Sequence, residues 1–214
     1  MVGGVKRLRL ELEAIVKGQV DIVIGTQLVA KGHNFPNITC VGIIDADLGL
    51  QNGDPRASER TYQLLQQVTG RAGRTGKFSK GLLQTYQPDN PVIKSLLSGE
   101  TEEFFKNEIK NRKTSVLPPF GRLAALVISS INQQQAFIHA KALRKAVPNS
   151  ISISTYGPAE APIHLVRGRY RYRLLIHAIR KADIQAYIRR MISDAPKPRG
   201  SIRVNIDIDP QNFM

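Results

Sequence analysis

Residues 59–74 read ERTYQLLQQVTGRAGR and join a helical pattern to two closely spaced arginines. Apolar side chains recur at helical spacing over the first ten residues and form one stripe, made of Tyr62, Leu65 and Val68. Gly70 then opens a turn, and Arg71 and Arg74 follow it. A guanidinium is permanently charged and forks onto phosphate oxygens, so two of them on a rigid helix suit a transferring phosphoryl group.

The elements around this helix alternate between helices and short apolar strands. We predict, in chain order, helix Val5–Val16, strands Asp21–Gly25 and Thr39–Asp45, helix Pro55–Val68 and strand Gly81–Tyr86. Such alternation favours an α/β fold with a parallel sheet whose strands are covered on both faces. Cys40, the only cysteine, is therefore expected to be a buried, small apolar side chain that forms no internal disulfide.

The second half of the chain has a different order of elements. A helical connector over residues 91–116 leads to Leu117-Pro118-Pro119, where the two prolines cannot continue a helix. Residues 117–214 then predict the order β-α-β-β-α-β of a ferredoxin-like domain. The predicted elements are strand Arg122–Ser129, helix Gln133–Val147, strands Ser150–Tyr156 and Tyr170–Ala178, helix Ala182–Ser193 and strand Ile202–Ile208.

Positive charge is concentrated in this second half. Of the net charge of +14, residues 1–100 carry 12 Lys+Arg and 9 Asp+Glu (+3), whereas residues 101–214 carry 19 and 8 (+11). A basic protein can be basic for solubility alone, but so uneven an excess favours a surface for nucleic acid or an anionic membrane. No stretch approaches the roughly 20 apolar residues that span a bilayer, which weakens the membrane alternative.

Within the second domain, residues 167–173 read RGRYRYR. Side chains alternate between the two faces of a strand, so we expect one face to carry Arg167, Arg169, Arg171 and Arg173. One interpretation is a solvated edge strand whose charges prevent aggregation. The one that we favour is a nucleic-acid surface, with Tyr170 and Tyr172 in the core instead of serving as stacking platforms.

Several stretches together resemble a known family. Residues 66–74 are similar to motif VI of superfamily 2 helicases, Gln-x-x-Gly-Arg-x-Gly-Arg, and residues 21–37, DIVIGTQLVAKGHNFPN, resemble motif V at the family's spacing. Four further stretches narrow the resemblance to the C-terminal part of the primosomal protein N′ (PriA) family of replication-restart helicases. They are LQTYQPDNPV (83–92), LPPFGRLA (117–124), RGRYRYRLL (167–175) and IDIDPQNF (206–213).

The resemblance implies a partial RecA-like helicase lobe over residues 1–90 and a DNA-binding domain over residues 117–214. It also implies roles for individual residues. Arg74 would be the arginine finger and Arg71 its partner on the γ-phosphate, with Gln67 contacting the same region. Gly32 would let the backbone approach the nucleotide, and Asn34 stands where many members carry a ribose-binding aspartate. The residues touching the DNA backbone would be Thr26 and Lys31.

The family's cofactors are ATP and Mg²⁺, and its zinc ligands lie before motif V. This chain has no Walker A lysine and no Asp-Glu pair of a Walker B strand, so we expect no ATP hydrolysis or unwinding by these residues alone. Its histidines show no metal-ligand spacing, and we expect no metal site; they are His33, His139, His164 and His177.

The family implies forked and single-stranded DNA, primosome proteins and single-stranded-DNA-binding protein as partners, and a cytoplasmic location. Two hypotheses follow. The chain is either part of a 3′–5′ DNA helicase that works with the missing N-terminal portion, as a fragment, split gene product or truncated form, or a standalone basic nucleic-acid-binding protein without ATPase activity.

Overall fold

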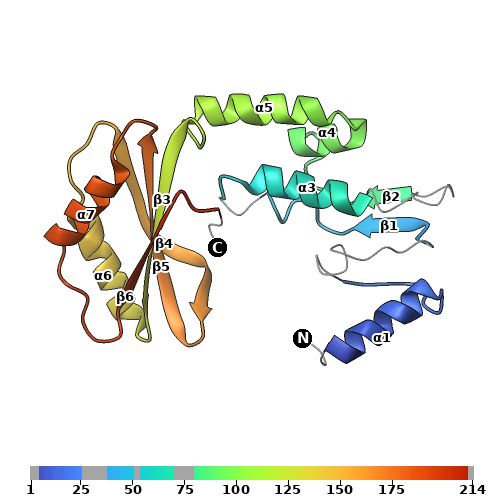
Figure 1. Ribbon diagram of the computed structural model, residues 1–214, viewed down its shortest axis with the longest axis horizontal. Coiled ribbons are helices and arrows are strands. Elements are labelled where there is room, and N and C mark those ends of the chain that lie inside the picture. Colours follow the sequence, from blue (N-terminus) through green and yellow to red (C-terminus); the bar gives the residue numbers. More distant parts are fainter. Residues whose placement is uncertain (1–4, 26–37, 51–53, 70–79, 212–214) are drawn as a thin grey trace. The chain divides into compact units, whose positions relative to one another are not determined.

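The computed structural model describes residues 5–25, 38–50, 54–69 and 80–211 (Figure 1). They divide into two compact units, residues 1–105 and residues 106–214. The division falls inside one helix, within the connector predicted over residues 91–116 and ahead of the proline pair. Each unit is described below by itself.

Unit 1 contains a β-α-β arrangement. Strand β1 (Cys40–Ile43) pairs in parallel with β2 (Lys80–Leu83), and helix α3 (Ala57–Thr69) lies between them in the sequence. Helix α1 (Val5–Val16) precedes them, and α4 (Pro91–Ser98) follows. The parallel pairing confirms the predicted α/β class of this half.

The prediction that the strands of this half are covered on both faces is wrong for the described residues. Residues 21–25 form no strand, and Ile22 and Ile24 are 77% and 93% exposed. Cys40 is exposed as well. Strand side chains alternate between faces, and only one face of the β1–β2 pair packs inward, with Ile43 and Leu83 against an apolar cluster.

The helical connector is two helices, α4 and α5 (Thr101–Thr114). Asn90 begins α4, since its side chain accepts a 3.0 Å hydrogen bond from the backbone N–H of Val92. Gly99 ends α4 with a φ of 73°, a conformation that glycine adopts without strain. The helical connector predicted over residues 91–116 did not include this stop.

Unit 2 confirms the ferredoxin-like prediction. Its elements are β3 (Gly121–Ser130), α6 (Gln133–Lys145), β4 (Ile153–Val166), β5 (Arg169–Ile179), α7 (Ile184–Asp194) and β6 (Arg203–Ile208). The strands form one antiparallel sheet in the order β4-β5-β3-β6. Figure 1 shows α6 and α7 together on one side of this sheet.

Short polar side chains begin both helices of unit 2. Asn132 accepts a hydrogen bond from the backbone N–H of Gln135, and Asp183 accepts one from that of Ala186. The helices cover one face of the sheet, and the core between them contains side chains of β3, β5 and both helices. Its fully buried members include Leu126, Ile128, Leu174, Ile176, Ile184 and Met191.

The segment before β3 is held against the sheet. The backbone oxygen of Val116 lies 2.9 Å from Nε2 of His177 on β5. Gly121 sits so close to the carbonyl of Val116 that a Cβ atom at this position would overlap it. Arg112, in the last turn of α5, donates to the carbonyl of Pro118. Unit 2 therefore includes residues ahead of its first strand.

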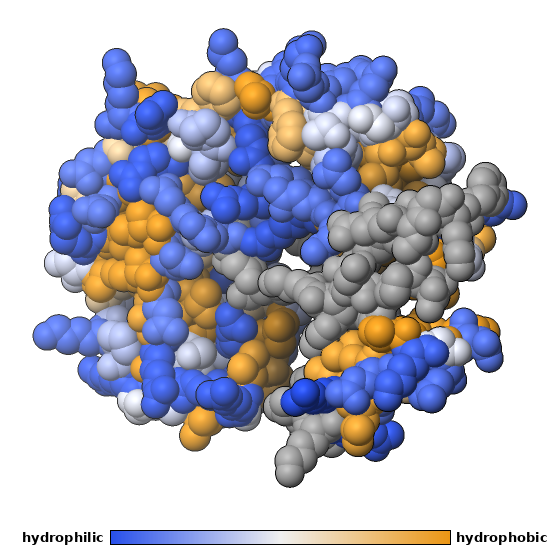
Figure 2. Space-filling model, turned by 45° about the vertical axis from the view of Figure 1, so that its right-hand side comes forward, coloured by the Kyte–Doolittle hydropathy of each residue, from blue (hydrophilic) through white to orange (hydrophobic). Residues whose placement is uncertain are grey.

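Apolar side chains also reach the surface. Figure 2 shows hydrophobic residues, in orange, along α1 at the lower right. On this helix Leu8 and Leu10 are 43% and 66% exposed. None of the helices in the described part of the chain combines the length and the hydrophobicity needed to cross a lipid bilayer.

Candidate nucleic-acid interface

The helix that leads into the two arginines is well anchored. In α3 the side chains of Tyr62 and Leu65 are 1% and 3% exposed, as the predicted stripe requires, and Val68 is half-buried. The ring of Tyr62 stacks on that of Phe104 at 4.0 Å, with an interplanar angle of 6°. Its hydroxyl lies 2.9 Å from Oγ1 of Thr101. Contacts with Thr101 and Phe104 therefore hold α3 in place.

Most of the predicted nucleotide and motif V residues lie outside the described residues. These are Thr26, Lys31, Gly32, Asn34, Arg71 and Arg74. Gln67 is described, and it is exposed near the C-terminal end of α3. Two guanidiniums and two amides are a donor set that fits phosphate and ribose oxygens, because all four groups donate hydrogen bonds to oxygen.

A buried carboxylate joins the ends of the two parallel strands. Asp47 is fully buried and accepts 2.6 Å hydrogen bonds from Oγ1 of Thr85 and from the backbone N–H of Tyr86. Its neighbour Asp45 is exposed, with a φ of 57°. The predicted strand Thr39–Asp45 ends at the first of these aspartates, and the structural role of Asp47 was not predicted. A strand followed by two spaced aspartates does not show which one turns inward.

The arginines of residues 167–173 do not form one row. Arg167 and Gly168 make the two-residue turn between β4 and β5, with φ values of 50° and 73°. Positive φ at both positions is typical of a type I′ hairpin. The expectation that Arg167 shares a strand face with the other three is therefore wrong, and its exposed side chain belongs to the tip of the hairpin.

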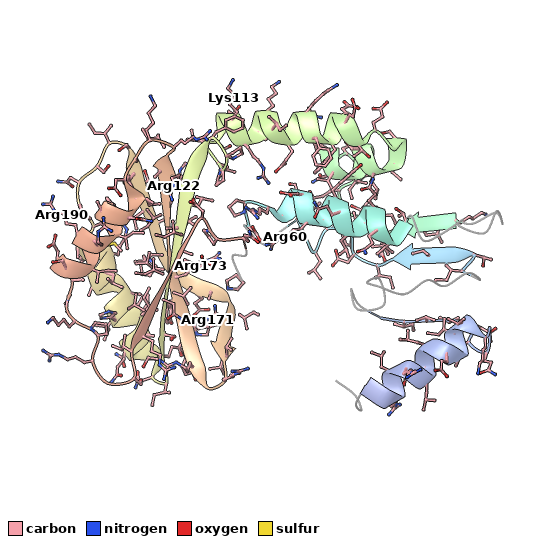
Figure 3. All side chains as sticks on the ribbon, viewed as in Figure 1. Arg60, Lys113, Arg122, Arg171, Arg173 and Arg190 are labelled. Carbon is pink, nitrogen blue, oxygen red and sulfur yellow. The ribbon has the colours of Figure 1, made fainter. Side chains whose placement is uncertain are left out.

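The other three arginines lie on the face of the sheet that the helices leave uncovered. Figure 3 shows Arg171 and Arg173 on the side away from α7. Arg169 donates to the carbonyls of Ser129 and Ser201, so its guanidinium links β3 to the segment before β6. Arg171 also donates to a backbone carbonyl, that of Ile163, at a longer distance of 3.5 Å. All three are half-buried.

The two tyrosines between these arginines point to the helix side, as predicted. Tyr172 is 6% exposed and its hydroxyl accepts a hydrogen bond from Nε2 of Gln133. Tyr170 is half-buried and its ring lies 5.5 Å from that of His164. Beside them is a shallow hollow of about 530 Å³, lined by Ile131, Asn132, Gln133, Gln134, Phe137, Tyr170 and Tyr172. Tyr170 is thus only partly a core residue.

The histidines that the structure describes do not form a cluster, and each has a structural role of its own. His139 is 6% exposed on the inner side of α6, and burial lowers its pKa below the ordinary value. Nδ1 of His164 lies 3.2 Å from the carbonyl of Arg171, and His177 contacts Val116. Over residues 5–25, 38–50, 54–69 and 80–211, no three His, Cys, Asp or Glu side chains form a group that could hold a metal ion. His33 lies outside these ranges.

Comparisons with known proteins give the same two-part division. Residues 6–76 match the family model "Helicase conserved C-terminal domain", and residues 113–211 match "Primosomal protein N C-terminal domain". Among curated relatives, the replication restart protein PriA of Rickettsia felis is 42% identical over 91% of this chain. The proteins of that name from Bacillus subtilis and Haemophilus influenzae are 33% and 34% identical over 95% and 94%. The chain spans 30%, 26% and 28% of these three relatives.

Proposed function

Because this chain belongs to the PriA family of replication restart proteins, we propose that it supplies the C-terminal part of an ATP-dependent DNA helicase that acts in replication restart. One observation carries the proposal: a helicase model and a primosomal model match the same chain in succession, and the relatives match across both. The proposal includes 3′–5′ unwinding of DNA at stalled forks. It also includes primosome proteins and single-stranded-DNA-binding protein as partners.

In this proposal Arg74 is the arginine finger and Arg71 its partner on the γ-phosphate, with Gln67 nearby. The anchored α3 supports it, because a cation that neutralises transition-state charge must be held in position before the reaction. Residues Gly32 and Asn34 would complete the nucleotide contacts, and Thr26 and Lys31 would contact the DNA backbone. ATP and Mg²⁺ would be held chiefly outside these residues, and the zinc of the family likewise.

The DNA-binding domain would be unit 2. Of the four arginines predicted to bind phosphate, the geometry most favours Arg167, which is exposed at the tip of the β4–β5 hairpin. Arg171 and Arg173 are half-buried on the uncovered face of the sheet and remain candidates. Arg169 is the weakest candidate, since two carbonyls already accept hydrogen bonds from its guanidinium.

Complementation tests the helicase proposal. The chain is mixed with the separately expressed portion of the Rickettsia felis relative that precedes the matched region, and DNA-stimulated ATP hydrolysis is measured. We expect no hydrolysis by the chain alone and recovery on mixing. Arg74→Ala should abolish the recovered activity while DNA affinity is unchanged. Arg9→Ala, at an exposed ion pair of α1, is the matched control and should retain the activity.

The alternative function is a standalone basic nucleic-acid-binding protein, and the net charge of +11 over residues 101–214 favours it. Tight, salt-dependent DNA binding by the chain without any recovered hydrolysis would support this alternative. Loss of DNA affinity in Arg74→Ala would contradict the arginine-finger role in either case.

A further inference from the structure

The helix-covered side of unit 2 carries more unpaired positive charge than the strand of arginines. Nine cations lie on α6, on α7 and on the two segments that join α7 to the sheet. They are Lys141, Arg144, Lys145, Arg180, Lys181, Arg189, Arg190, Lys197 and Arg199, and all nine are exposed. We call this set the α6–α7 basic face.

Few acidic groups balance it. The same elements contain two carboxylates, Asp183 and Asp194. Asp183 accepts the hydrogen bond that begins α7. Asp194 pairs with Arg190 at 3.8 Å, and within the described residues this is the one ion pair made by these nine cations. Nine positive and two negative charges leave a net of +7 on these elements.

On two other helices of the chain, arginines form ion pairs with glutamates of the same helix. On α1, Arg7 and Arg9 each pair with a glutamate four residues further on, at 3.0 and 3.3 Å. On α5, Arg112 pairs with Glu108 at 2.8 Å. Such pairs keep a helix soluble without building up a field. The α6 helix contains no acidic residue at all, so solubility alone does not account for its composition.

We propose that the α6–α7 basic face binds the phosphate backbone of duplex DNA. Like charges held close together repel one another, and a polyanion relieves this repulsion while releasing its counterions. Cations on helices packed against a sheet keep their spacing, which suits the regular backbone of a duplex. Figure 3 shows Arg190 on the outer side of α7, away from the sheet.

The aromatic residues of these two helices favour a duplex over a single strand. Proteins that bind single strands stack the bases on exposed aromatic rings. Tyr187 is 7% exposed, and its hydroxyl lies 3.0 Å from Oγ1 of Thr155. Phe137 is half-buried, and Nζ of Lys141 lies 4.4 Å from the centre of its ring. The face therefore offers charge without a stacking platform.

This inference rests on the proposed DNA-binding function, and the experiment separates the two. Dissociation constants of the full chain are measured by fluorescence anisotropy for a mixed-sequence duplex and for one of its strands, at several salt concentrations. The first variant is Lys141→Gln/Arg144→Gln/Lys145→Gln, and the second is Arg180→Gln/Lys181→Gln/Arg189→Gln. A matched control removes three exposed charges elsewhere, Lys17→Gln/Lys110→Gln/Lys113→Gln.

We expect each face variant to bind the duplex roughly tenfold or more weakly at about 0.1 M salt. The slope of the logarithm of the binding constant against the logarithm of the salt concentration should be shallower by about 1 to 3. Single-strand affinity should fall less, and the control should stay close to the parent chain. All substituted side chains are exposed, so the circular dichroism spectrum should not change.

Three outcomes would overturn the inference. Equal losses in control and face variants would show that net charge alone matters, and a larger loss for the single strand would reverse the assignment. Tighter binding to phosphatidylserine vesicles than to DNA would indicate a membrane surface. Failure of the parent chain to bind any DNA would instead remove the DNA-binding function from which the inference starts.

Discussion

The backbone N–H of Tyr86 donates a 2.6 Å hydrogen bond to the carboxylate of Asp47, 39 residues earlier in the chain. Asp47 is fully buried, and the same carboxylate accepts from the hydroxyl of Thr85. The bond joins the segments that follow β1 and β2, so it connects the two strands beyond their backbone ladder. The first of these segments precedes α3 in the sequence, and the second leads directly into α4.

Asp47→Asn should destabilise unit 1 by roughly 1.5–3 kcal/mol, because the two buried hydrogen bonds lose their negatively charged acceptor. Urea unfolding of the full chain, followed by circular dichroism, measures the change. Asp45→Asn makes the same substitution at an exposed position whose positive φ asparagine tolerates, and it should be nearly neutral. Equal effects of the two variants would show that Asp47 has no special structural role.

Tyr62→Phe should cost about 1 kcal/mol and Tyr62→Ala about 3–5 kcal/mol, since the first removes one hydrogen bond and the second also removes a buried ring. Both can be measured by thermal unfolding. If α3 holds Arg71 and Arg74 in place, ATP hydrolysis recovered by complementation should fall in the same order. Full activity in a folded Tyr62→Ala chain would contradict that positioning role.

Arg169 and Arg171 should respond differently to the same substitution. Arg169→Ala leaves the carbonyls of Ser129 and Ser201 without their donor and should lower the stability of unit 2 by roughly 1–3 kcal/mol. Arg171→Ala removes a proposed phosphate contact and should weaken DNA binding more than Arg169→Ala does. Thermal unfolding and anisotropy titrations separate the two effects, and identical profiles would argue against the distinction.

The stability of unit 2 should fall as the pH is lowered through the range in which histidine titrates. Burial depresses the pKa of His139 in the folded chain, so between the folded and unfolded pKa values the unfolded chain binds more protons. Stability is thus highest above the unfolded value, near 6.5, and declines until the folded pKa is passed. In His139→Gln the difference in unfolding free energy between pH 7.5 and 5 should be smaller, and an unchanged difference would assign the pH dependence to other groups.

The sequence predicted the element order of unit 2 because each helix and most strands carry their own period and boundary residues. The length of strand β4 was not predicted correctly. It continues to Val166, whereas the prediction ended at Tyr156 ahead of Pro158 and Pro162. Edge strands tolerate proline, and β4 is at the edge of the sheet with two register shifts. Edge position is a property of the tertiary fold, which a local pattern does not contain.

The same limit applied to the candidate site. The alternation of arginine and tyrosine correctly placed Tyr172 in the core, because period two is a local property. The hydrogen bonds of Arg169 to the carbonyls of Ser129 and Ser201 could not be predicted in this way. These carbonyls come near Arg169 only through the pairing of strands that are distant in the sequence. The turn at Arg167 has a local signal, because Gly168 follows it, but the alternation of arginine and tyrosine after it is equally typical of a continuous strand.

The contact between Val116 and Gly121 determines how the C-terminal unit could be produced separately. A clone that started at the proline pair or at β3 would lose the carbonyl that His177 contacts and would leave the tightly packed glycine beside an empty space. An autonomous version should instead begin within α5, early enough to keep Glu108 and its ion-pair partner Arg112.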